Sequence, residues 1–302
     1  KYFTIRTSVM KIVMTIPAYN EEKTIGRLVS EIKKIVNKER YDYKILVVDD
    51  GSKDKTAEIA KKAGAIVYSH PKNYGLAETF KTEIAKSLSL KPDVIVHIDA
   101  DFQYQAKEIP KLIEEIRNGY DLVLGSRFKG KIEEMPFIKK LGNIAFSKVV
   151  SQITSLQISD AQTGFRAFTK EVAERIPITS NHTYTQEQII RAVKLKYKIK
   201  EVPIYFAKRY GKSRLITSTL GYAIRAWINI IRIYRDYEPL KFFGTVGTLI
   251  FSLGFLIGLY LIYLHFTTGI VGHFALLMLN VLIISIGLQI IIFGFIADMS
   301  RK

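Results

Sequence analysis

The sequence contains no cysteine among its 302 residues. This absence excludes disulfide bonds and thiolate-ligated metals, is typical of a reducing compartment, and leaves oxygen atoms as the ready ligands for a divalent cation. The chain also lacks the phosphate-binding signatures Gly-x-x-x-x-Gly-Lys-Ser/Thr and Gly-x-Gly-x-x-Gly. A phosphate would therefore have to be held by a metal ion and side chains instead of a glycine-rich loop.

The N-terminal segment Lys1–Met10 has no apolar core of signal-peptide length, so we expect the N-terminal part not to be exported. Long uncharged apolar runs are found instead at 242–264 and 274–297. Each is long enough, as a helix, to cross a hydrocarbon core of about 30 Å, which predicts two transmembrane helices. The alternative is a pair of buried helices in a globular core.

The short segment 265–273 between these runs requires an antiparallel hairpin, and it contains neither Lys nor Arg. Basic residues precede the first run and follow the second, namely Arg235, Lys241, Arg301 and Lys302. The positive-inside rule therefore predicts an integral membrane protein with both outer ends of the hairpin, and the domain that precedes it, on the cytoplasmic face. We expect an archaeal or bacterial cell membrane in preference to the endoplasmic reticulum.

The formal net charge is +17, from 45 Lys and Arg against 28 Asp and Glu. The basic residues crowd toward the apolar runs and form no recognisable nucleic-acid motif, so we expect anionic lipid and no nucleic acid as a partner. Asn280 and Gln289 lie inside the second run and need polar partners, either across the hairpin or in a homo-oligomer.

Between Lys11 and Arg127, short β-rich runs alternate with helical patterns, which predicts an α/β fold with a mostly parallel, Rossmann-like sheet. The predicted strands are 12–16, 44–48, 65–68, 93–98 and 121–124, and the predicted helices are 25–37, 55–63, 76–88 and 106–117. The segment 215–237 interleaves Arg and aromatic residues with Ile and Ala, which is typical of an amphipathic helix at a lipid interface. A linker helix packed on the domain is the alternative.

The strand predicted at 93–98 ends in two carboxylates, Asp99 and Asp101, followed by Gln103. Open α/β sheets bind ligands at the carboxyl ends of their strands, and oxygen ligands there suit Mg²⁺ or Mn²⁺ bound together with phosphates. An Asp pair in this position is also compatible with a helix cap or a turn.

Five motifs in this order resemble family 2 glycosyltransferases, and among them the polyprenyl-phosphate sugar synthases typified by dolichyl-phosphate mannose synthase. They are Ile16-Pro17-Ala18-Tyr19-Asn20-Glu21, Val47-Val48-Asp49-Asp50-Gly51-Ser52, Asp99-Ala100-Asp101-Phe102-Gln103, Gly125-Ser126-Arg127 and Asp160-Ala161-Gln162-Thr163-Gly164-Phe165-Arg166. The resemblance covers about residues 11 to 241. It implies a GT-A catalytic domain at 1–213, amphipathic interface helices at 214–241 and a transmembrane hairpin at 242–302.

By this resemblance, the nucleotide donor is bound by three loops that contain Pro17, Tyr19, Glu21, Asp49, Asp50, Asp99, Ala100 and Asp101. Asp101 and Gln103 are implied as ligands of Mg or Mn, with Asp99 facing donor hydroxyls and also reaching the metal. Asn20 and Ser52 are candidates either for ligand contact or for capping the helices that follow.

The resemblance also implies a basic site for the acceptor phosphate, formed by Arg127, Lys139, Asn143, Lys208, Arg209 and Arg214. The family pattern Arg-x-x-Gly-x-Ser-Lys has Lys208 and Arg214 at its ends here, so whether Lys208 or Arg209 contacts the phosphate stays open. A solvated basic loop is the alternative. Asp99, Asp101, Arg127 and Glu187 are the implied catalytic set; Glu187 binds sugar hydroxyls, orients the acceptor, or favours a helix N-terminus.

The implied reaction moves a sugar from GDP-mannose, UDP-glucose or UDP-N-acetylglucosamine to a polyprenyl or dolichyl phosphate with inversion. A lipid phosphate is already an anion at neutral pH, so no general base is needed to activate it. Two other interpretations stay open, a polysaccharide synthase of the same fold and a non-catalytic lipid-binding membrane adaptor. The first is disfavoured because the chain lacks a Gln-x-x-Arg-Trp motif.

Overall fold

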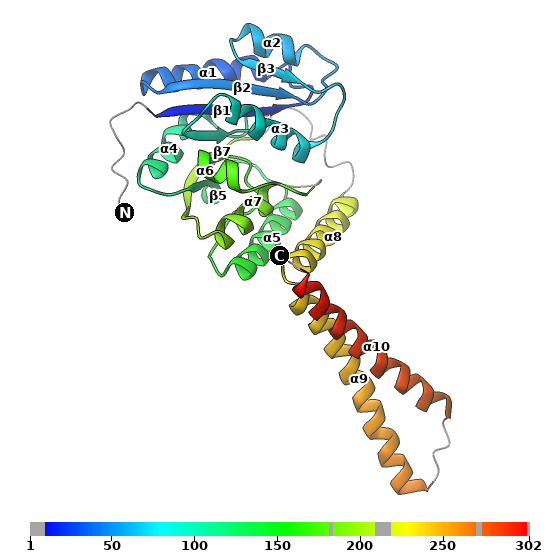
Figure 1. Ribbon diagram of the computed structural model, residues 1–302. Coiled ribbons are helices and arrows are strands. Elements are labelled where there is room, and N and C mark those ends of the chain that lie inside the picture. The colour runs from blue at the N-terminus through cyan, green and yellow to red at the C-terminus, as the bar shows by residue number, and fades with distance from the viewer. Residues whose placement is uncertain (1–9, 181–183, 209–218, 270–273, 301–302) are drawn as a thin grey trace. The chain divides into compact units, whose positions relative to one another are not determined.

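The computed structural model describes residues 10–180, 184–208, 219–269 and 274–300, and the chain divides into two compact units, Lys1–Thr219 and Leu220–Lys302. Figure 1 shows the alternation of strands and helices in the first unit and the long helices of the second. The strands are β1 Lys11–Ala18, β2 Asp42–Asp49, β3 Ile66–Ser69, β4 Val94–His97, β5 Leu122–Ile132, β6 Arg166–Thr169 and β7 Ile199–Phe206. The helices of the first unit are α1 Ile25–Lys38, α2 Thr56–Lys62, α3 Leu76–Ser89, η1 Ala106–Glu108, α4 Ile109–Arg117, α5 Phe137–Thr154, α6 Lys170–Arg175 and α7 Thr185–Lys194.

Among the described residues the strands form one seven-stranded sheet in the order β3-β2-β1-β4-β6-β5-β7. Within that part of the chain β6 alone runs against the others: β4 and β5 each pair with it antiparallel, while the remaining pairs are parallel. The mostly parallel α/β prediction is confirmed. Because β6 is reversed, it begins at the edge where β4 ends, with Arg166 directly opposite His97.

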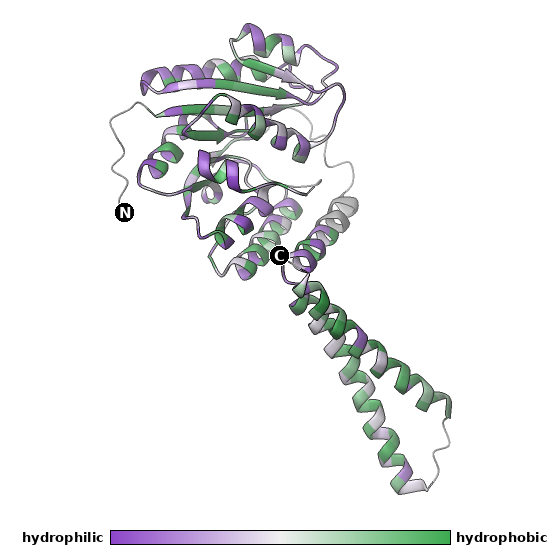
Figure 2. Cartoon of the chain, viewed as in Figure 1, coloured by the Kyte–Doolittle hydropathy of each residue, from purple (hydrophilic) through white to green (hydrophobic). Residues whose placement is uncertain are grey.

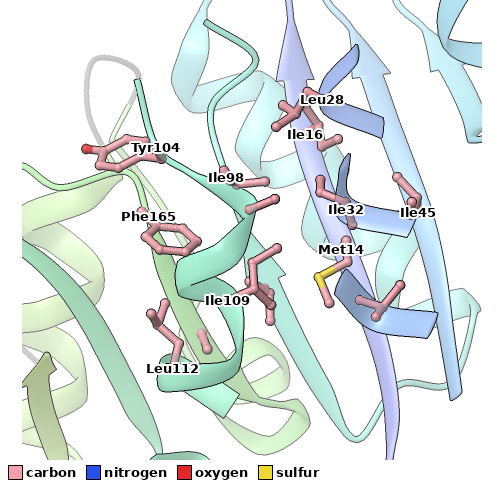
Figure 3. Packing of buried hydrophobic residues seen from close by; sticks show 14 of the residues in the cluster. Met14, Ile16, Leu28, Ile32, Ile45, Ile98, Tyr104, Ile109, Leu112 and Phe165 are labelled. Atoms are coloured by element: carbon pink, nitrogen blue, oxygen red, sulfur yellow. The ribbon is translucent and has the colours of Figure 1, made fainter. Parts of the chain in front are cut away.

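The main core lies between the sheet and the face covered by α1 and α4. Alternate residues of β1, such as Met14 and Ile16, meet Leu28 and Ile32 of α1 there, and Figure 3 shows this packing. In a strand successive side chains point to opposite faces. Val94 and Val96 of β4 therefore join this core, whereas His97 points to the other face, where α3 packs.

The predicted helix at 106–117 is a short 3₁₀ turn, η1, followed by α4. Pro110 lies in the first turn of α4, where a residue without an N–H is tolerated because that donor has no partner inside the helix. The strand predicted at 121–124 continues to Ile132 as β5. The remaining predicted elements of this region match the observed ones to within two residues at their ends.

The second unit contains α8 Thr219–Tyr237, α9 Pro239–Thr268 and α10 Phe274–Met299. Among the described helices, α9 and α10 are long and apolar enough to cross a membrane, and Figure 2 shows α10 mostly in the hydrophobic colour and α9 in green mixed with paler stretches. Only 17% and 11% of their most apolar windows are buried, which the alternative of core helices does not predict. On α8, Trp227 and Ile231 are exposed, and its place at a lipid interface stays a prediction.

Glycines bring α9 and α10 into close contact. A Cβ atom added to Gly287 would lie 2.6 Å from the backbone nitrogen of Phe251, and one added to Gly247 would lie 2.8 Å from the carbonyl oxygen of Gly287. Asn280 is buried beside Gly258, so it faces across the hairpin as one of the two sequence alternatives predicts. Gln289 is exposed on α10, and an association that would cover it stays a prediction.

Candidate active site at the carboxyl edge of the sheet

Three loops that the sequence assigns to a nucleotide follow β1, β2 and β4, which are neighbours in the sheet. The pairing of Ala18 with Asp49 aligns the ends of β1 and β2, and Thr15 pairs with His97 at the end of β4. Because the carboxyl ends of parallel strands meet at one edge, the structure brings these loops together. Open α/β sheets bind their ligands at such an edge.

Hydrogen bonds tie the first loop to the second. The backbone N–H of Asn20 donates to Ser52 Oγ at 2.8 Å, and the backbone N–H of Lys53 donates to Asn20 Oδ1 at 2.7 Å. Asn20 has a φ of 54°, a left-handed conformation that Asn tolerates better than most residues. The interpretation of Asn20 and Ser52 as helix caps is wrong, because both side chains bond across the loops and the N-caps are Thr24 and Lys55.

The carboxylate of Asp50 is buried and holds the loop after β3. Its Oδ1 accepts hydrogen bonds from Tyr74 N at 2.9 Å and His70 Nδ1 at 2.8 Å, and its Oδ2 accepts from Gly75 N at 2.9 Å. A nucleotide contact by Asp50 would share oxygens that already order this loop. Asp49, also buried, accepts from the backbone of the second loop through Oδ1.

The other predicted donor residues of these loops differ in burial. Pro17 and Ala100 are buried, while Tyr19 and Glu21 are partly exposed at the sheet edge. The backbone N–H of Glu21 donates to Thr56 Oγ1 at 2.8 Å, which attaches the first loop to the start of α2. Of these four residues, Tyr19 and Glu21 are therefore the ones whose side chains reach solvent, on a loop whose backbone is held in place.

The loop after β4 has an unusual backbone. Phe102, between Asp101 and Gln103, is buried with a φ of 66°, a left-handed conformation that is an outlier for a bulky residue. Gln103 anchors the loop to the end of β7, because its carbonyl accepts from Ala207 N at 2.9 Å and its Nε2 donates to the Ala207 carbonyl at 3.3 Å. The amide nitrogen of Gln103 is thereby occupied, and Oε1 is the atom that can meet a cation.

Asp99 is held between a glycine and a histidine. Its Oδ1 lies 3.6 Å from His97 Nε2, and its side chain is 34% exposed in a largely buried surrounding. A Cβ atom on Gly164 would come within 2.7 Å of Asp99 Oδ2, so only glycine leaves room for the carboxylate in this position. Gly164, which lies just before the reversed strand β6, therefore contributes the space that it leaves for the Asp99 carboxylate.

Behind Asp99 lies a fully buried polar network that the sequence analysis missed. His97 Nδ1 is 2.6 Å from Glu83 Oε2 on α3, and His97 Nε2 is 2.7 Å from the Tyr184 hydroxyl. Burial lowers the pKa of His97, but Glu83 and Asp99 outweigh it and raise the pKa to about 9. The imidazole is therefore protonated at neutral pH and carries a positive charge beneath Asp99.

The loop after β4 fits a divalent cation that is shared with phosphates. Among the described residues no three His, Asp or Glu side chains form a metal-binding group. Mg²⁺ commonly takes one or two protein carboxylates and completes its shell with water and substrate phosphates. Asp99, Asp101 and the amide oxygen of Gln103 supply that kind of oxygen set.

Arg127, predicted to contact the acceptor phosphate, forms a buried bidentate ion pair with Asp160. Nε and Nη2 each lie 2.7 Å from an Asp160 oxygen, and the Arg127 backbone N–H donates to the same carboxylate at 3.0 Å. Burial alone would lower the pKa of Arg127, but Tyr104, Asp160 and Asp99 raise it. The guanidinium is thus a positive charge held in a fixed position, and it interacts electrostatically with Asp99.

The other predicted acceptor residues are spread over α5 and the end of β7. Lys139 is half-buried in the first turn of α5, and Asn143 is buried with Nδ2 3.6 Å from Met135 Sδ. Asn143 Oδ1 has no hydrogen-bond partner among the described residues. Lys208 is exposed and its Nζ lies 2.7 Å from Glu134, whereas Arg209 and Arg214 lie outside the described residues.

Glu187 is buried and fully engaged by neighbouring groups. Its Oε1 accepts from Thr179 Oγ1 at 2.7 Å and from Arg191 Nε at 2.8 Å, and its Oε2 accepts from Ser180 N at 2.9 Å. These contacts hold Thr179 and Ser180 against α7. A direct contact of Glu187 with a sugar or acceptor stays a prediction.

One sequence signal could have revealed the missed Glu83. It lies three residues after Phe80 on the buried stripe of α3, where an apolar residue is the normal choice. Phe80 stacks on Tyr184 with ring centroids 3.8 Å apart. The polar network of His97, Glu83 and Tyr184 therefore lies beside the aromatic contact between α3 and the start of α7.

The sequence model of the family described as Glycosyl transferase family 2 matches residues 14–177. A dolichyl-phosphate hexose transferase from Haloferax volcanii is 34% identical, with 70% of this chain and 90% of the relative covered. A dolichol-phosphate mannosyltransferase from Pyrococcus furiosus is 33% identical, with 79% and 68% covered. A UDP-N-acetylglucosamine–dolichyl-phosphate N-acetylglucosaminyltransferase from Methanococcus voltae is 32% identical, with 70% and 92% covered.

The fold is also similar to that of a solved glycosyltransferase. Glucosyl-3-phosphoglycerate synthase from Mycobacterium tuberculosis, in complex with Mn²⁺, uridine diphosphate and phosphoglyceric acid, superimposes with a TM-score of 0.57. The sequences are 19% identical, and the match covers 73% of this chain and 78% of that one. At this identity the likeness concerns the GT-A architecture of the catalytic unit.

Proposed function

This chain belongs to glycosyl transferase family 2, and on that basis we propose that it transfers a sugar from a nucleotide-sugar donor to a polyprenyl or dolichyl phosphate. The product would be a sugar linked to a lipid phosphate for use in glycan assembly. Relatives that are more than 30% identical over most of their length carry dolichyl-phosphate sugar transferase names, which supports the acceptor class.

The observation that carries the proposal is the loop after β4. Asp99 and Asp101 follow the carboxyl end of the central strand β4, at the edge that also carries the loops after β1 and β2, and Gln103 anchors their loop to the end of β7. A diphosphate held there would lie at the edge where open α/β sheets bind nucleotides. A merely structural turn would need neither the strained Phe102 nor the space left by Gly164.

Glycosyl transfer develops negative charge on the leaving diphosphate and positive charge on the sugar ring. We propose that Asp99, Asp101 and Gln103 hold Mg²⁺ or Mn²⁺, which supplies Lewis-acid stabilisation of the leaving group. The catalytic unit contributes mainly position and electrostatics: Asp99 is fixed between Gly164 and protonated His97. Direct attack by the lipid phosphate on the anomeric carbon would invert its configuration.

The acceptor phosphate requires cations within reach of the reacting carbon. Arg127 is the proposed permanent charge, because its ion pair with Asp160 fixes the guanidinium, and Tyr104, Asp160 and Asp99 together raise its pKa against the effect of burial. Lys139, Asn143 and Lys208 stay proposed acceptor contacts. Asn143 Oδ1 is buried without a partner in the described part of the chain, which is compatible with a ligand that completes its hydrogen bonding.

The donor is proposed only as a nucleotide sugar, with GDP-mannose, UDP-glucose and UDP-N-acetylglucosamine as the candidates. The names of similar relatives differ in the sugar, mannose in one and N-acetylglucosamine in another, at nearly equal identity. Overall identity therefore does not indicate the sugar, and Asp49 and Tyr19 at the nucleotide loops are the proposed donor contacts. Glu187 is retained as a proposed contact on the sugar side.

We further propose that α9 and α10 anchor the chain as a transmembrane hairpin with the catalytic unit in the cytoplasm. The support is their length and apolar character together with basic residues at the outer ends of the pair. The exposed Gln289 would favour homo-oligomers, since a polar side chain in hydrocarbon seeks a partner.

The test mixes the purified full chain in lipid nanodiscs with Mn²⁺ or Mg²⁺, dolichyl or undecaprenyl phosphate and each candidate donor. We expect one donor to give a single lipid-linked sugar, and chelator to abolish its formation. Asp101→Asn should lower turnover by roughly 100-fold, because a metal ligand is lost. Asp42→Asn, which changes an exposed carboxylate at the start of β2, is the matched control and should keep full activity.

A sugar polymer instead of a single glycolipid would show a polysaccharide synthase. No product with any donor, together with nucleotide binding that ignores chelator and Asp101→Asn, would favour a non-catalytic adaptor. Either result would overturn the proposal.

A further inference from the structure

The backbone outlier in the loop after β4 lies in the middle of the proposed metal site. Phe102, with its φ of 66°, stands between Asp101 and Gln103, the two residues proposed to hold the cation together with Asp99. A left-handed conformation is unfavourable for a bulky side chain and persists only where the surrounding structure imposes it. The contacts of Phe102 must therefore stabilise a backbone that this residue does not favour by itself.

Hydrogen bonds close the loop on both sides of Phe102. Asp101 Oδ1 accepts from the Gln103 N–H at 3.1 Å, and the Phe102 carbonyl accepts from Gln105 Nε2 at 3.0 Å. The bond from Gln103 to Asp101 spans Phe102, so the φ of Phe102 and the orientation of the Asp101 carboxylate are coupled. A loop in which Phe102 left this conformation would no longer present Asp101 and Gln103 in the same way.

Two parts of the catalytic unit hold the ring of Phe102. The side chain is buried as a member of the main core. Arg27, in the first turn of α1, covers the ring, with its guanidinium carbon 4.4 Å from the ring centroid. A guanidinium at this distance from an aromatic face is attracted by the negative charge of the π-system. The ring is thus held both by the core and by a cation from α1.

We propose that Arg27 is a positioning residue for the metal, because its stacking on Phe102 stabilises the left-handed loop that presents Asp101 and Gln103 to the cation. This inference rests on the proposed function, since it concerns the divalent cation that the donor diphosphate would share. Arg27 acts through the ring and touches neither the metal nor the donor. When fewer molecules hold the loop in its binding conformation, the apparent affinity for the cation falls in proportion.

The sign of the effect separates this role from a simple charge effect. A guanidinium close to a cation site repels the cation, so its charge alone would weaken metal binding. Removing Arg27 would then make metal binding tighter. Stabilisation of the loop by stacking predicts the opposite result, namely weaker metal binding without Arg27.

The experiment measures the Kd of the purified full chain for Mn²⁺ from the EPR signal of the free ion, alone and with UDP or GDP. We expect Arg27→Gln to raise this Kd about fivefold, which corresponds to about 1 kcal/mol. The midpoint of thermal unfolding should change little, because the Arg27 side chain is 61% exposed. Arg27→Lys, which keeps a cation that can lie over the ring, should restore part of the affinity.

Two control variants isolate the stacking contact. Arg27 also forms an ion pair with Glu31 at 3.1 Å, and Glu31→Gln removes this pair while it keeps the guanidinium over Phe102. Arg117→Gln removes a contact of the same kind elsewhere, in which the guanidinium carbon lies 5.2 Å from the ring centroid of Tyr41, just before β2. Both variants should leave the Kd for Mn²⁺ unchanged.

A double-mutant cycle tests whether Arg27 acts through the ring of Phe102. In a Phe102→Leu background, which lacks the ring, Arg27→Gln should have no further effect on the Kd. An equal effect in both backgrounds would overturn the proposal. If Phe102→Leu does not fold, the comparison of Arg27→Gln with Arg117→Gln decides by itself.

The other outcomes also decide the proposal. An unchanged or lower Kd in Arg27→Gln would overturn it, and so would an equal rise in Arg117→Gln. If the unchanged chain binds no Mn²⁺ alone or with either nucleotide, the proposed metal site and the role of Arg27 both fail. Formation of a lipid-linked sugar by the unchanged chain tests the proposed function separately, because transfer can be observed whether or not Arg27 affects the Kd.

Discussion

Gly164→Ala tests whether the space beside Asp99 sets the catalytic rate. The added Cβ would lie 2.7 Å from Asp99 Oδ2 and 2.9 Å from Oδ1. Because nonbonded heavy atoms normally approach to about 3.5 Å, the carboxylate would have to retreat by about 0.8 Å. A displacement of about 1 Å in a reacting constellation can lower a rate by about 100-fold, which corresponds to about 2.7 kcal/mol in the barrier.

The assay is the rate of lipid-linked sugar formation at saturating donor and metal, with the midpoint of thermal unfolding recorded in parallel. We expect kcat to fall by about 100-fold while the midpoint changes little, because the methyl meets a partly exposed side chain. Gly26→Ala is the matched control: its Cβ would meet Ile59 Cγ2 at 2.8 Å, an equally tight contact in the core between α1 and α2. That variant should change the unfolding midpoint and keep kcat.

A kcat for Gly164→Ala within about threefold of the original value would refute the reasoning. It would mean that Asp99 can move without cost, and that the glycine of this motif serves the backbone at the start of β6. If kcat of Gly26→Ala falls to the same extent, any tight contact disturbs turnover. The loss of kcat in Gly164→Ala could then not be attributed to Asp99.

Two further predictions follow from the buried charges. The pKa of His97 is raised from 6.5 to about 9, so the ion pairs of His97 contribute about 3 kcal/mol to the free energy of unfolding. This contribution is fully present below pH 6.5 and is lost as the pH rises through 9. Thermal unfolding measured between about pH 6 and 10 should show the decline, and Glu83→Gln should make the pH dependence weaker. Arg127→Ala leaves Asp160 buried without its partner and should destabilise the catalytic unit by about 3–5 kcal/mol. Adding Asp160→Asn to Arg127→Ala should restore much of the thermal unfolding midpoint but not the KM for the acceptor. If the midpoint and the KM both recover, Arg127 has no role in acceptor binding.

Much of the fold was predictable because burial leaves a local pattern. The runs that become β1, β2 and β4 are apolar on both faces, and helices such as α1 repeat buried residues at helical spacing. The reversed strand β6 left no such signal. Its four residues, Arg166–Thr169, include a buried arginine, and their direction is decided by pairing with β4 and β5. Strand direction is a non-local property that a single sequence does not encode in any one segment.

The candidate site was predictable to the extent that its residues occur in short motifs. Asp99, Asp101 and Gln103 are grouped in sequence and in space, and their neighbours on β1 and β2 were correctly brought to the same edge. The partners of these residues were not predictable. Glu83 reaches His97 from α3, the helix that connects β3 to β4, and such a contact depends on tertiary packing. The role of Asp50 in holding a loop likewise became visible only with its three donors in place.

The reversed strand has a consequence for how this enzyme can diversify. It joins β3, β2, β1 and β4, on the side of the proposed donor site, to β5 and β7, on the side of the proposed acceptor site. The join is short, with four residue pairs on one side and three on the other. On the proposed assignment, the donor site and the acceptor site lie on opposite sides of this join, and Gln103 links them through its hydrogen bonds to Ala207. A lineage that exchanges its sugar while it keeps its lipid carrier would therefore change the loops after β1 and β2 and keep Gln103.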